Sequence, residues 1–232
     1  MIVSRHMTFH ILTIFPELFA PYLHESVIGK GIARGKIRVK VYNLRNYTTD
    51  KHGKVDDKPY GGGPGMVIRI EPLVVALRDI LKGKTKGSVG VAVMTPGGTQ
   101  FNNKVAGQLA KRGKHLVIIA GRYEGIDARL AGVVYGSFGI RVKHISVGPY
   151  VLTGGELPAL VVVDAVARQI EGVLGKSESL EERRYGVGVP VYSRPEVFEY
   201  GGRQYRVPRV LTSGDHGQID KWRKGKSKSK SA

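Results

Sequence analysis

The amino-acid sequence predicts an α/β fold with a mostly parallel sheet, followed by a smaller second domain. Strand-like and helix-like segments alternate along residues 1–175, which is the pattern of a sheet covered by helices. Two strand candidates, residues 88–94 and 115–120, are short and almost continuously apolar, as strands buried on both faces of a parallel sheet are. With 232 residues, 41% of them hydrophobic, the chain is long enough for a sizeable core.

The other elements of the first domain follow from hydrophobic periodicity. Residues 8–15 and 37–42 are rich in β-branched and apolar side chains, and the second segment alternates nearly as a half-buried strand does. Residues 72–81 and 103–112 each place apolar side chains on one helical face, and residues 156–170 form the longest helix candidate. These segments complete an alternating β and α order.

The composition changes at Lys176. Residues 176–190 are charged and rich in glycine, which predicts a linker, and residues 191–232 form the expected second domain. The chain ends in KWRKGKSKSKSA, where six Lys or Arg residues lie between Lys221 and Lys230. This tail is interpreted as a solvated end or as a basic arm on RNA, and the two interpretations are compatible.

Charge is the strongest signal in the composition. Lys and Arg number 37 against 19 Asp and Glu, a formal net charge of +18. The excess is +12 in residues 1–175 and +6 in residues 176–232, so both parts are expected to face a polyanion. A protein with this positive charge is expected to bind nucleic acid, and an anionic membrane surface is the second candidate. A charge of this size also occurs in ribosome-associated proteins.

Other bulk features restrict the class of protein. The sequence has no cysteine, which excludes disulfides and thiolate metal sites and fits a cytoplasmic protein. It has no apolar run near 18 residues and no signal-peptide core at its start, so neither a membrane span nor export is expected. Met1 and Met7 are both candidate start residues. The spacing of Asp and Glu predicts no metal cage.

Glycine-rich turns follow the expected strands. Residues 94–98, 121–127 and 146–156 come after apolar segments, and loops at the carboxyl ends of parallel strands gather at one edge of the sheet. Their backbone groups and tyrosines suit an adenine-containing ligand. Residues 58–66, KPYGGGPGM, form another close-approach loop. Neither a phosphate-binding G-x-x-x-x-G-K-[ST] loop nor a strand followed by G-x-G-x-x-G is present, which argues against a Rossmann site.

The motifs resemble one family. VDDKPYGGGPGM, GRYEGID, SVGPYVLTGGELPA, DAVAR, GVLG, SRPE and LTSGDH, in this order, resemble the bacterial tRNA (guanine-N1)-methyltransferases that modify position 37, from Thr8 to Arg223. The resemblance implies a SPOUT-type α/β fold with a trefoil knot and a small, mostly helical C-terminal domain that binds tRNA. It also implies S-adenosylmethionine as methyl donor, an activity associated with Mg²⁺, and a homodimer whose subunits share the active site.

The resemblance assigns site residues position by position. Those placed around S-adenosylmethionine are Met94, Thr95, Pro96, Gly121, Tyr123, Glu124, Gly125, Val147, Gly148, Pro149, Tyr150, Val151, Leu152, Gly154 and Gly155. Those assigned to RNA are Lys51, His52, Lys58, Arg183, Arg194, His216, Lys221 and Arg223. Arg168 falls on the arginine that acts on the target guanine, whose O6 edge gains negative charge as N1 loses its proton. A salt bridge to Asp164 is the structural alternative for Arg168.

Three features of the sequence depart from the family pattern. Arg183 occupies the slot of the general-base aspartate, so Glu182 beside it is the predicted base, ahead of Glu178 and Glu181. Pro149 replaces an aspartate in the third loop, and the chain ends soon after Trp222, where the family continues. The alternatives to an active guanine-N1 enzyme are a weak or inactive RNA-binding relative and a SPOUT enzyme with another target nucleotide.

Overall fold

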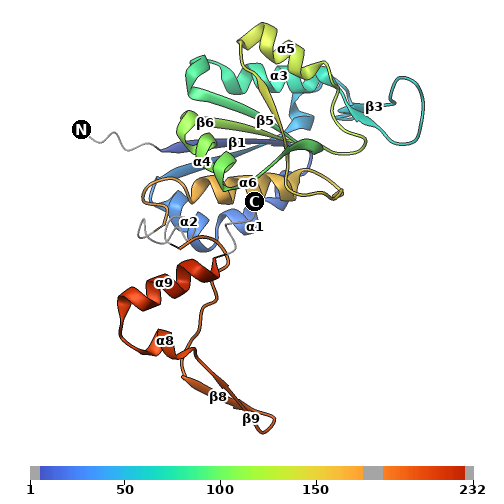
Figure 1. The fold of residues 1–232 in the computed structure, drawn as a ribbon. Coiled ribbons are helices and arrows are strands. Elements are labelled where there is room, and N and C mark those ends of the chain that lie inside the picture. The colour runs from blue at the N-terminus through green and yellow to red at the C-terminus, as the bar shows by residue number, and fades with distance from the viewer. Residues whose placement is uncertain (1–5, 175–184, 228–232) are drawn as a thin grey trace. The chain divides into compact units, whose positions relative to one another are not determined.

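A computed structural model of the chain describes residues 6–174 and 185–227 (Figure 1). The chain divides into two compact units, residues 1–175 and residues 176–232. The first unit contains the large sheet and its covering helices, and the described residues of the second form a β-hairpin and two helices. Among the described residues, no helix is long and apolar enough to cross a membrane.

The first unit is built on a five-stranded sheet in which every neighbouring pair of strands is parallel. The strands are β1 (Met7–Thr13), β2 (Ile37–Asn43), β5 (Val89–Gln100), β6 (His115–Ala120) and β7 (Val142–Ser146), in the order β2-β1-β6-β5-β7. β5 and β6 lie inside the sheet, and residues 89–94 of β5 and most of β6 are β-branched or other apolar residues that are buried on both faces. The expected α/β fold with a parallel sheet is therefore confirmed.

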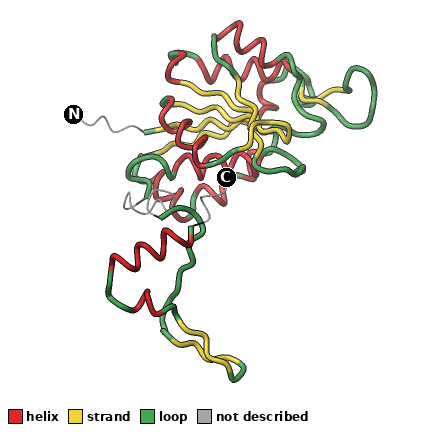
Figure 2. Tube along the Cα trace, in the orientation of Figure 1, coloured by secondary structure: helices red, strands yellow, loops and turns green. Residues whose placement is uncertain are grey.

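Helices cover both faces of this sheet, so the unit has three layers (Figures 1 and 2). On one face lie α1 (Ala20–Leu23), α2 (Ser26–Ala33), α4 (Asn103–Arg112) and α6 (Glu156–Ala167), and on the other lie α3 (Ile70–Leu81) and α5 (Leu130–Phe138). Each face has its own apolar core. Phe9 and Ile11 of β1 point into the first core, whereas Leu12 packs in the second, as alternation along a strand requires.

Short elements connect these layers. They are the 3₁₀ helices η1 (Pro16–Leu18), η2 (Leu44–Tyr47) and η3 (Lys86–Ser88), and the two-stranded ribbon of β3 (Asp56–Asp57) and β4 (Val67–Ile68). The ribbon closes the glycine-rich loop 58–66 at its base. Ile68 of β4 also forms a parallel bridge to Ile126, so this loop is joined to the turn after β6.

Several predicted boundaries need correction. The strand expected at residues 88–94 continues to Gln100, so residues 94–98 are an irregularity inside β5 rather than a turn after it. Both Met94 and Thr99 pair with Ile145, which means that β5 bulges outwards by four residues and then rejoins β7. The last helix of the unit ends at Ala167, not at residue 170. In contrast, β6 and α4 have the expected bounds.

The second unit contains β8 (Val197–Tyr200), β9 (Arg203–Arg206), α8 (Arg209–Thr212) and α9 (His216–Lys226). Asp215 caps α9 by accepting a hydrogen bond from the Gln218 backbone at 3.0 Å. The hairpin was not predicted, although Gly201 and Gly202 between its strands both have positive φ, as the favoured two-residue hairpin turn requires. The domain expected to be mostly helical therefore contains a β-hairpin as well.

Candidate functional site

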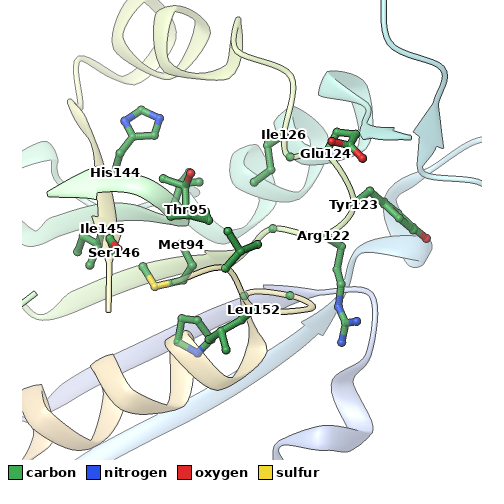
Figure 3. Close-up of a pocket in the computed structure, with 18 of the residues that line it drawn as sticks. Met94, Thr95, Arg122, Tyr123, Glu124, Ile126, His144, Ile145, Ser146 and Leu152 are labelled. Carbon is green, nitrogen blue, oxygen red and sulfur yellow. The ribbon is translucent and has the colours of Figure 1, made fainter. Parts of the chain in front are cut away.

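Three loops enclose a cavity of about 380 Å³ at one edge of the large sheet (Figure 3). They are the bulge of β5, residues 121–127 after β6, and residues 147–155 after β7. These three strands are neighbours in the order β6-β5-β7, and parallel strands end at the same edge. A cavity outside the carboxyl ends of parallel strands is the usual ligand site of an α/β sheet.

The cavity gathers most of the residues that were expected to hold the methyl donor. Its lining includes Met94, Thr95, Pro96, Gly121, Tyr123, Glu124, Gly125, Val147, Gly148, Tyr150, Val151, Leu152, Gly154 and Gly155. Pro149 alone of that expected set is not in the lining. In Figure 3, Met94 and Thr95 of β5 and Leu152 of the loop after β7 line the same cavity although they are far apart in the sequence. Sequence reasoning missed Arg122, Asp127 and His144, which also line the cavity.

The second loop has a constrained backbone. Tyr123 has a φ of 59°, an uncommon value for a residue with a side chain, and Gly125 has a φ of 130°. The Glu124 backbone N–H donates to the Met66 carbonyl at 3.0 Å, and the Ile68 N–H donates to the Gly125 carbonyl at 2.9 Å. These bonds hold the unusual conformation against the segment that ends the glycine-rich loop. Such strain, when the surroundings fix it, is typical of ligand sites.

A buried polar network ties the second and third loops to β1. Glu156, the first residue of α6, is 3% exposed. Its Oε1 accepts a hydrogen bond from the Thr13 hydroxyl at 2.9 Å, and its Oε2 accepts one from the Arg122 Nε at 2.8 Å. Arg122 also donates to the Thr153 carbonyl at 3.3 Å, and its guanidinium lies 4.6 Å from the centre of the Phe15 ring. One carboxylate therefore fixes three segments beside the cavity.

The third loop passes directly over the end of β6. The Gly155 N–H donates to the Gly121 carbonyl at 2.7 Å, and Arg122 and Gly154 form an antiparallel bridge. A Cβ atom on Gly155 would lie 2.7 Å from the Gly121 nitrogen and 2.8 Å from the Ala120 Cα, both of which are backbone atoms. Only glycine allows this approach, and so Gly155 sets how closely the two loops meet.

Of the two predicted catalytic residues, only Arg168 can be located. It is the C-cap of α6, half-buried, and it is not among the residues that line the cavity of its own chain. Asp164 accepts a hydrogen bond from the Tyr22 hydroxyl at 2.6 Å, and this bond raises the pKa of Tyr22 to about 12. The salt bridge to Asp164 that was the structural alternative for Arg168 is not among the ion pairs of the described residues. Glu182, like Arg183, Glu178 and Glu181, lies outside the described residues.

Two acidic side chains line the cavity, Glu124 and Asp127. Arg129 donates from its Nε to Asp127 Oδ1 at 2.9 Å, and this hydrogen bond lowers the pKa of the Asp127 carboxyl. Asp127 is therefore a weak base, whereas Glu124 has no such ion pair in the part of the chain that the structure describes. Nor do the described residues contain a group of three or more His, Asp or Glu placed to hold a metal.

The residues assigned to RNA lie on both units. Lys51, His52 and Lys58 are exposed in the first unit, and Arg194, His216 and Lys221 are exposed in the second. Arg223 is half-buried, because its Nη1 donates to the Tyr185 hydroxyl at 3.0 Å and its guanidinium lies over the Tyr185 ring. Asp220 accepts a hydrogen bond from the same hydroxyl at 3.0 Å. Arg223 thus helps to hold α9 in place within its unit.

Comparison with known proteins identifies relatives along nearly the whole chain. The model of a family described as tRNA (Guanine-1)-methyltransferase TrmD matches residues 7–232. The tRNA (guanine-N(1)-)-methyltransferase of Moorella thermoacetica is 43% identical over 94% of this chain and 84% of its own length. Its namesake in Dictyoglomus turgidum is 44% identical over 92% and 82%, and that of Clostridioides difficile is 40% identical over 95% and 92%.

Proposed function

This chain belongs to the tRNA (guanine-1)-methyltransferase family, and we propose that its three-loop cavity binds the methyl donor for transfer to N1 of the guanosine at position 37 of tRNA. As a member of this family the chain is a tRNA methyltransferase, and S-adenosylmethionine is the donor that such a family implies. The observation that carries the proposed site is the cavity itself, which lies at the carboxyl ends of β5, β6 and β7.

The chemistry of the lining fits S-adenosylmethionine. Four of its large apolar or aromatic side chains are exposed in the chain alone: Tyr123 and Tyr150 at 49% and 54%, Val151 at 82% and Leu152 at 40%. An adenine ring offers them a flat apolar partner, and glycine backbone groups nearby can bond its edge. When bound, S-adenosylmethionine supplies an electrophilic methyl group. The third loop passes close to the second loop, and this supports our inference that residues 121–155 form a trefoil knot.

We infer that the active enzyme is a homodimer in which each site takes residues from both subunits. A helix of twelve residues is about 18 Å long. The first turn of α6 lies at the cavity, which Gly155 and Pro158 line, and Arg168 caps the other end of the helix. Arg168 therefore lies at the end of α6 that is far from the cavity of its own chain. Leu157 and Val161, one turn apart on α6, are 65% and 48% exposed. Antiparallel packing of two α6 helices about a twofold axis buries this apolar stripe and brings Arg168 to the partner's cavity.

Within that dimer, different residues carry out the separate steps of N1 methylation. The Arg168 guanidinium binds the O6 edge of guanine and stabilises its negative charge as the N1 proton leaves. Glu182 accepts that proton, and the basic side chains beside it favour its ionised form. The cavity orients the reacting groups, so no covalent intermediate is needed. The second unit, with ten basic and four acidic residues over 191–232, binds tRNA, and Mg²⁺ is a proposed aid to activity.

Methyl transfer to defined transcripts tests the function. The full chain should transfer labelled methyl from S-adenosylmethionine to a tRNA transcript with guanosine at position 37, and mass mapping should place the methyl on that base. A transcript with adenosine at this position is the matched control and should remain unlabelled. Labelling of both transcripts at another nucleotide would identify a different target. Tight tRNA binding with no transfer to either would identify a binding protein.

Substitution tests which residue is the general base. Glu182→Gln should lower transfer by roughly a hundredfold or more, the usual scale for loss of a general base, with donor binding intact. Arg168→Ala should also lose transfer, because the anion is no longer stabilised. Glu178→Gln and Glu181→Gln are neighbouring controls, and Glu124→Gln tests the acidic side chain in the cavity. Full activity of Glu182→Gln together with loss in one of these variants would reassign the base to that residue.

A further inference from the structure

The β8–β9 hairpin has two faces of different chemistry. The strands pair Val197 with Arg206, Phe198 with Tyr205, Glu199 with Gln204 and Tyr200 with Arg203. Directly paired residues of antiparallel strands lie on the same face, and successive residues of one strand alternate between faces. Phe198, Tyr200, Arg203 and Tyr205 therefore share one face, named here the aromatic face, and Val197, Glu199, Gln204 and Arg206 share the other.

The aromatic face is open in this structure. Phe198 is 57% exposed, Tyr200 is 73% exposed and Tyr205 is 54% exposed, and Arg203 is also exposed. The rings of Phe198 and Tyr200 are nearly parallel, with an angle of 6° between their planes and 6.4 Å between their centres. Three large rings on four positions of an exposed hairpin form no part of the two apolar cores, which consist of residues of the first unit.

The opposite face is held together by its own polar side chains. Gln204 donates a hydrogen bond to Glu199, and Arg206 donates one to Gln204 at 2.6 Å. These bonds run across and along the strands, so this face can keep the hairpin rigid. They also occupy Glu199, the only acidic residue of the two strands. The hairpin therefore presents aromatic rings and an arginine, without a competing carboxylate, on a single surface.

We propose that the aromatic face is a platform on which unpaired bases of the RNA substrate stack. Aromatic rings bind bases of any sequence through their faces, and an adjacent arginine both stacks and pairs with phosphate. The charge of residues 191–232, ten basic against four acidic, favours RNA over a protein surface as the occupant. The proposal rests on the proposed binding of tRNA by the second unit and assigns unpaired bases to one defined surface of it.

Equilibrium binding of the full chain to tRNA, measured over a range of salt concentrations, tests the platform. The double variant Phe198→Ala/Tyr200→Ala should raise the Kd about tenfold or more, the scale of losing stacking on one to two bases. The slope of log Kd against log salt should not change, because no charge has been removed. Arg203→Gln should weaken binding and reduce the slope by about 0.7, the value for one contact with a single strand.

Matched controls separate stacking from damage to the hairpin. Phe198→Tyr/Tyr200→Phe keeps both rings and should bind as the unaltered chain does. Val197→Ala changes the opposite face only and leaves its two hydrogen bonds in place, so it should alter the Kd less than twofold. An anticodon stem–loop should be bound more tightly than a fully paired duplex of equal length, and the double alanine variant should lose most of that preference.

The outcomes distinguish this inference from the proposed function. If the unaltered chain binds and methylates tRNA and the double alanine variant binds it equally well, the platform is wrong and the function stands. If light scattering shows that the double variant no longer forms the oligomer of the unaltered chain, the aromatic face is a protein interface and the platform is also wrong. If the unaltered chain does not bind tRNA at all, the proposed function fails first.

Discussion

His10 is a buried histidine whose neighbours oppose a positive charge. It is 2% exposed in the middle of β1, with its Nδ1 2.9 Å from the Tyr42 hydroxyl and its Nε2 3.2 Å from the His115 Nδ1. Burial is the main cause that lowers the pKa of His10 to about 4, and the nearby positive charge of Lys84 is the second cause. Burial also lowers the pKa of His115. Both rings are therefore neutral near pH 7, and the sheet loses stability if they must take up protons.

The free energy of unfolding should fall in mild acid because of His10. Above a pH of about 6.5 neither state binds the proton, and between about 6.5 and about 4 only the unfolded chain does, so stability decreases as the pH falls through this window. By about pH 5 the expected loss is about 2 kcal/mol. Urea unfolding at about pH 7 and pH 5 measures it, and His10→Gln should lose less between the two. The exposed His24 gives a control, His24→Gln, which should behave as the unaltered chain does.

At the scale of elements, the carboxylate at the start of α6 holds the cavity together. Glu156 bonds Thr13 at the end of β1 and Arg122 in the loop after β6, and it belongs to the segment that follows the loop after β7. The arrangement depends on the charge, because Arg122 is half-buried and needs a paired anion. Removing one partner of a buried ion pair leaves an uncompensated charge, which costs about 3–5 kcal/mol.

Glu156→Gln should therefore loosen two loops of the cavity at once. We expect the Kd for S-adenosylmethionine, measured by calorimetry, to rise about tenfold or more, and the thermal unfolding temperature to fall by several degrees. The control is Glu71→Gln, since the pair of Glu71 with Arg69 at 3.4 Å is mainly exposed and contributes about 0–1 kcal/mol. Unchanged donor affinity in Glu156→Gln would mean that the loops keep their shape without the network.

At the scale of the whole molecule, the length of α6 separates Arg168 from the cavity of its own chain, and a second copy supplies the missing arginine in the proposed dimer. The unaltered chain should scatter light as a dimer, with twice the mass of one 25.3 kDa chain. Leu157→Glu, which places a charge in the apolar stripe, should scatter as a monomer and lose methyl transfer. Val75→Glu is the control, because Val75 is also exposed but lies on α3, on the other face of the sheet.

Mixing two inactive variants tests whether the sites are shared. Arg168→Ala keeps the cavity intact, and Gly155→Val disrupts the cavity while keeping Arg168. A mixed dimer contains one intact cavity facing an intact arginine only if Arg168 acts on the partner's site. Exchange of subunits should then restore methyl transfer that neither variant has alone. Persistent inactivity of an equilibrated mixture would mean that Arg168 acts within its own chain or plays a structural role.

The fold class, the family and the extent of several elements followed from the sequence. Strand β6 and helix α4 have the bounds that their apolar patterns predicted, because a run of buried residues and a one-sided apolar face are local signals. Among the elements that were missed, α5 and β7 lie in residues 130–146, where glycines interrupt the apolar pattern. The bulge of β5 was interpreted as a turn, because glycine and proline at residues 96–98 signal both.

Sequence alone determined that this is an α/β methyltransferase of tRNA, because ordered motifs and a strong positive charge are properties of the chain itself. Only the tertiary structure decided that Thr13, Arg122 and Glu156 form one network, since residues more than a hundred positions apart meet only when β1, β6 and α6 pack together. The pairing of β8 with β9 likewise decided which aromatic side chains share a face. Contacts between distant segments depend on how the elements pack, and no local pattern in the sequence records them.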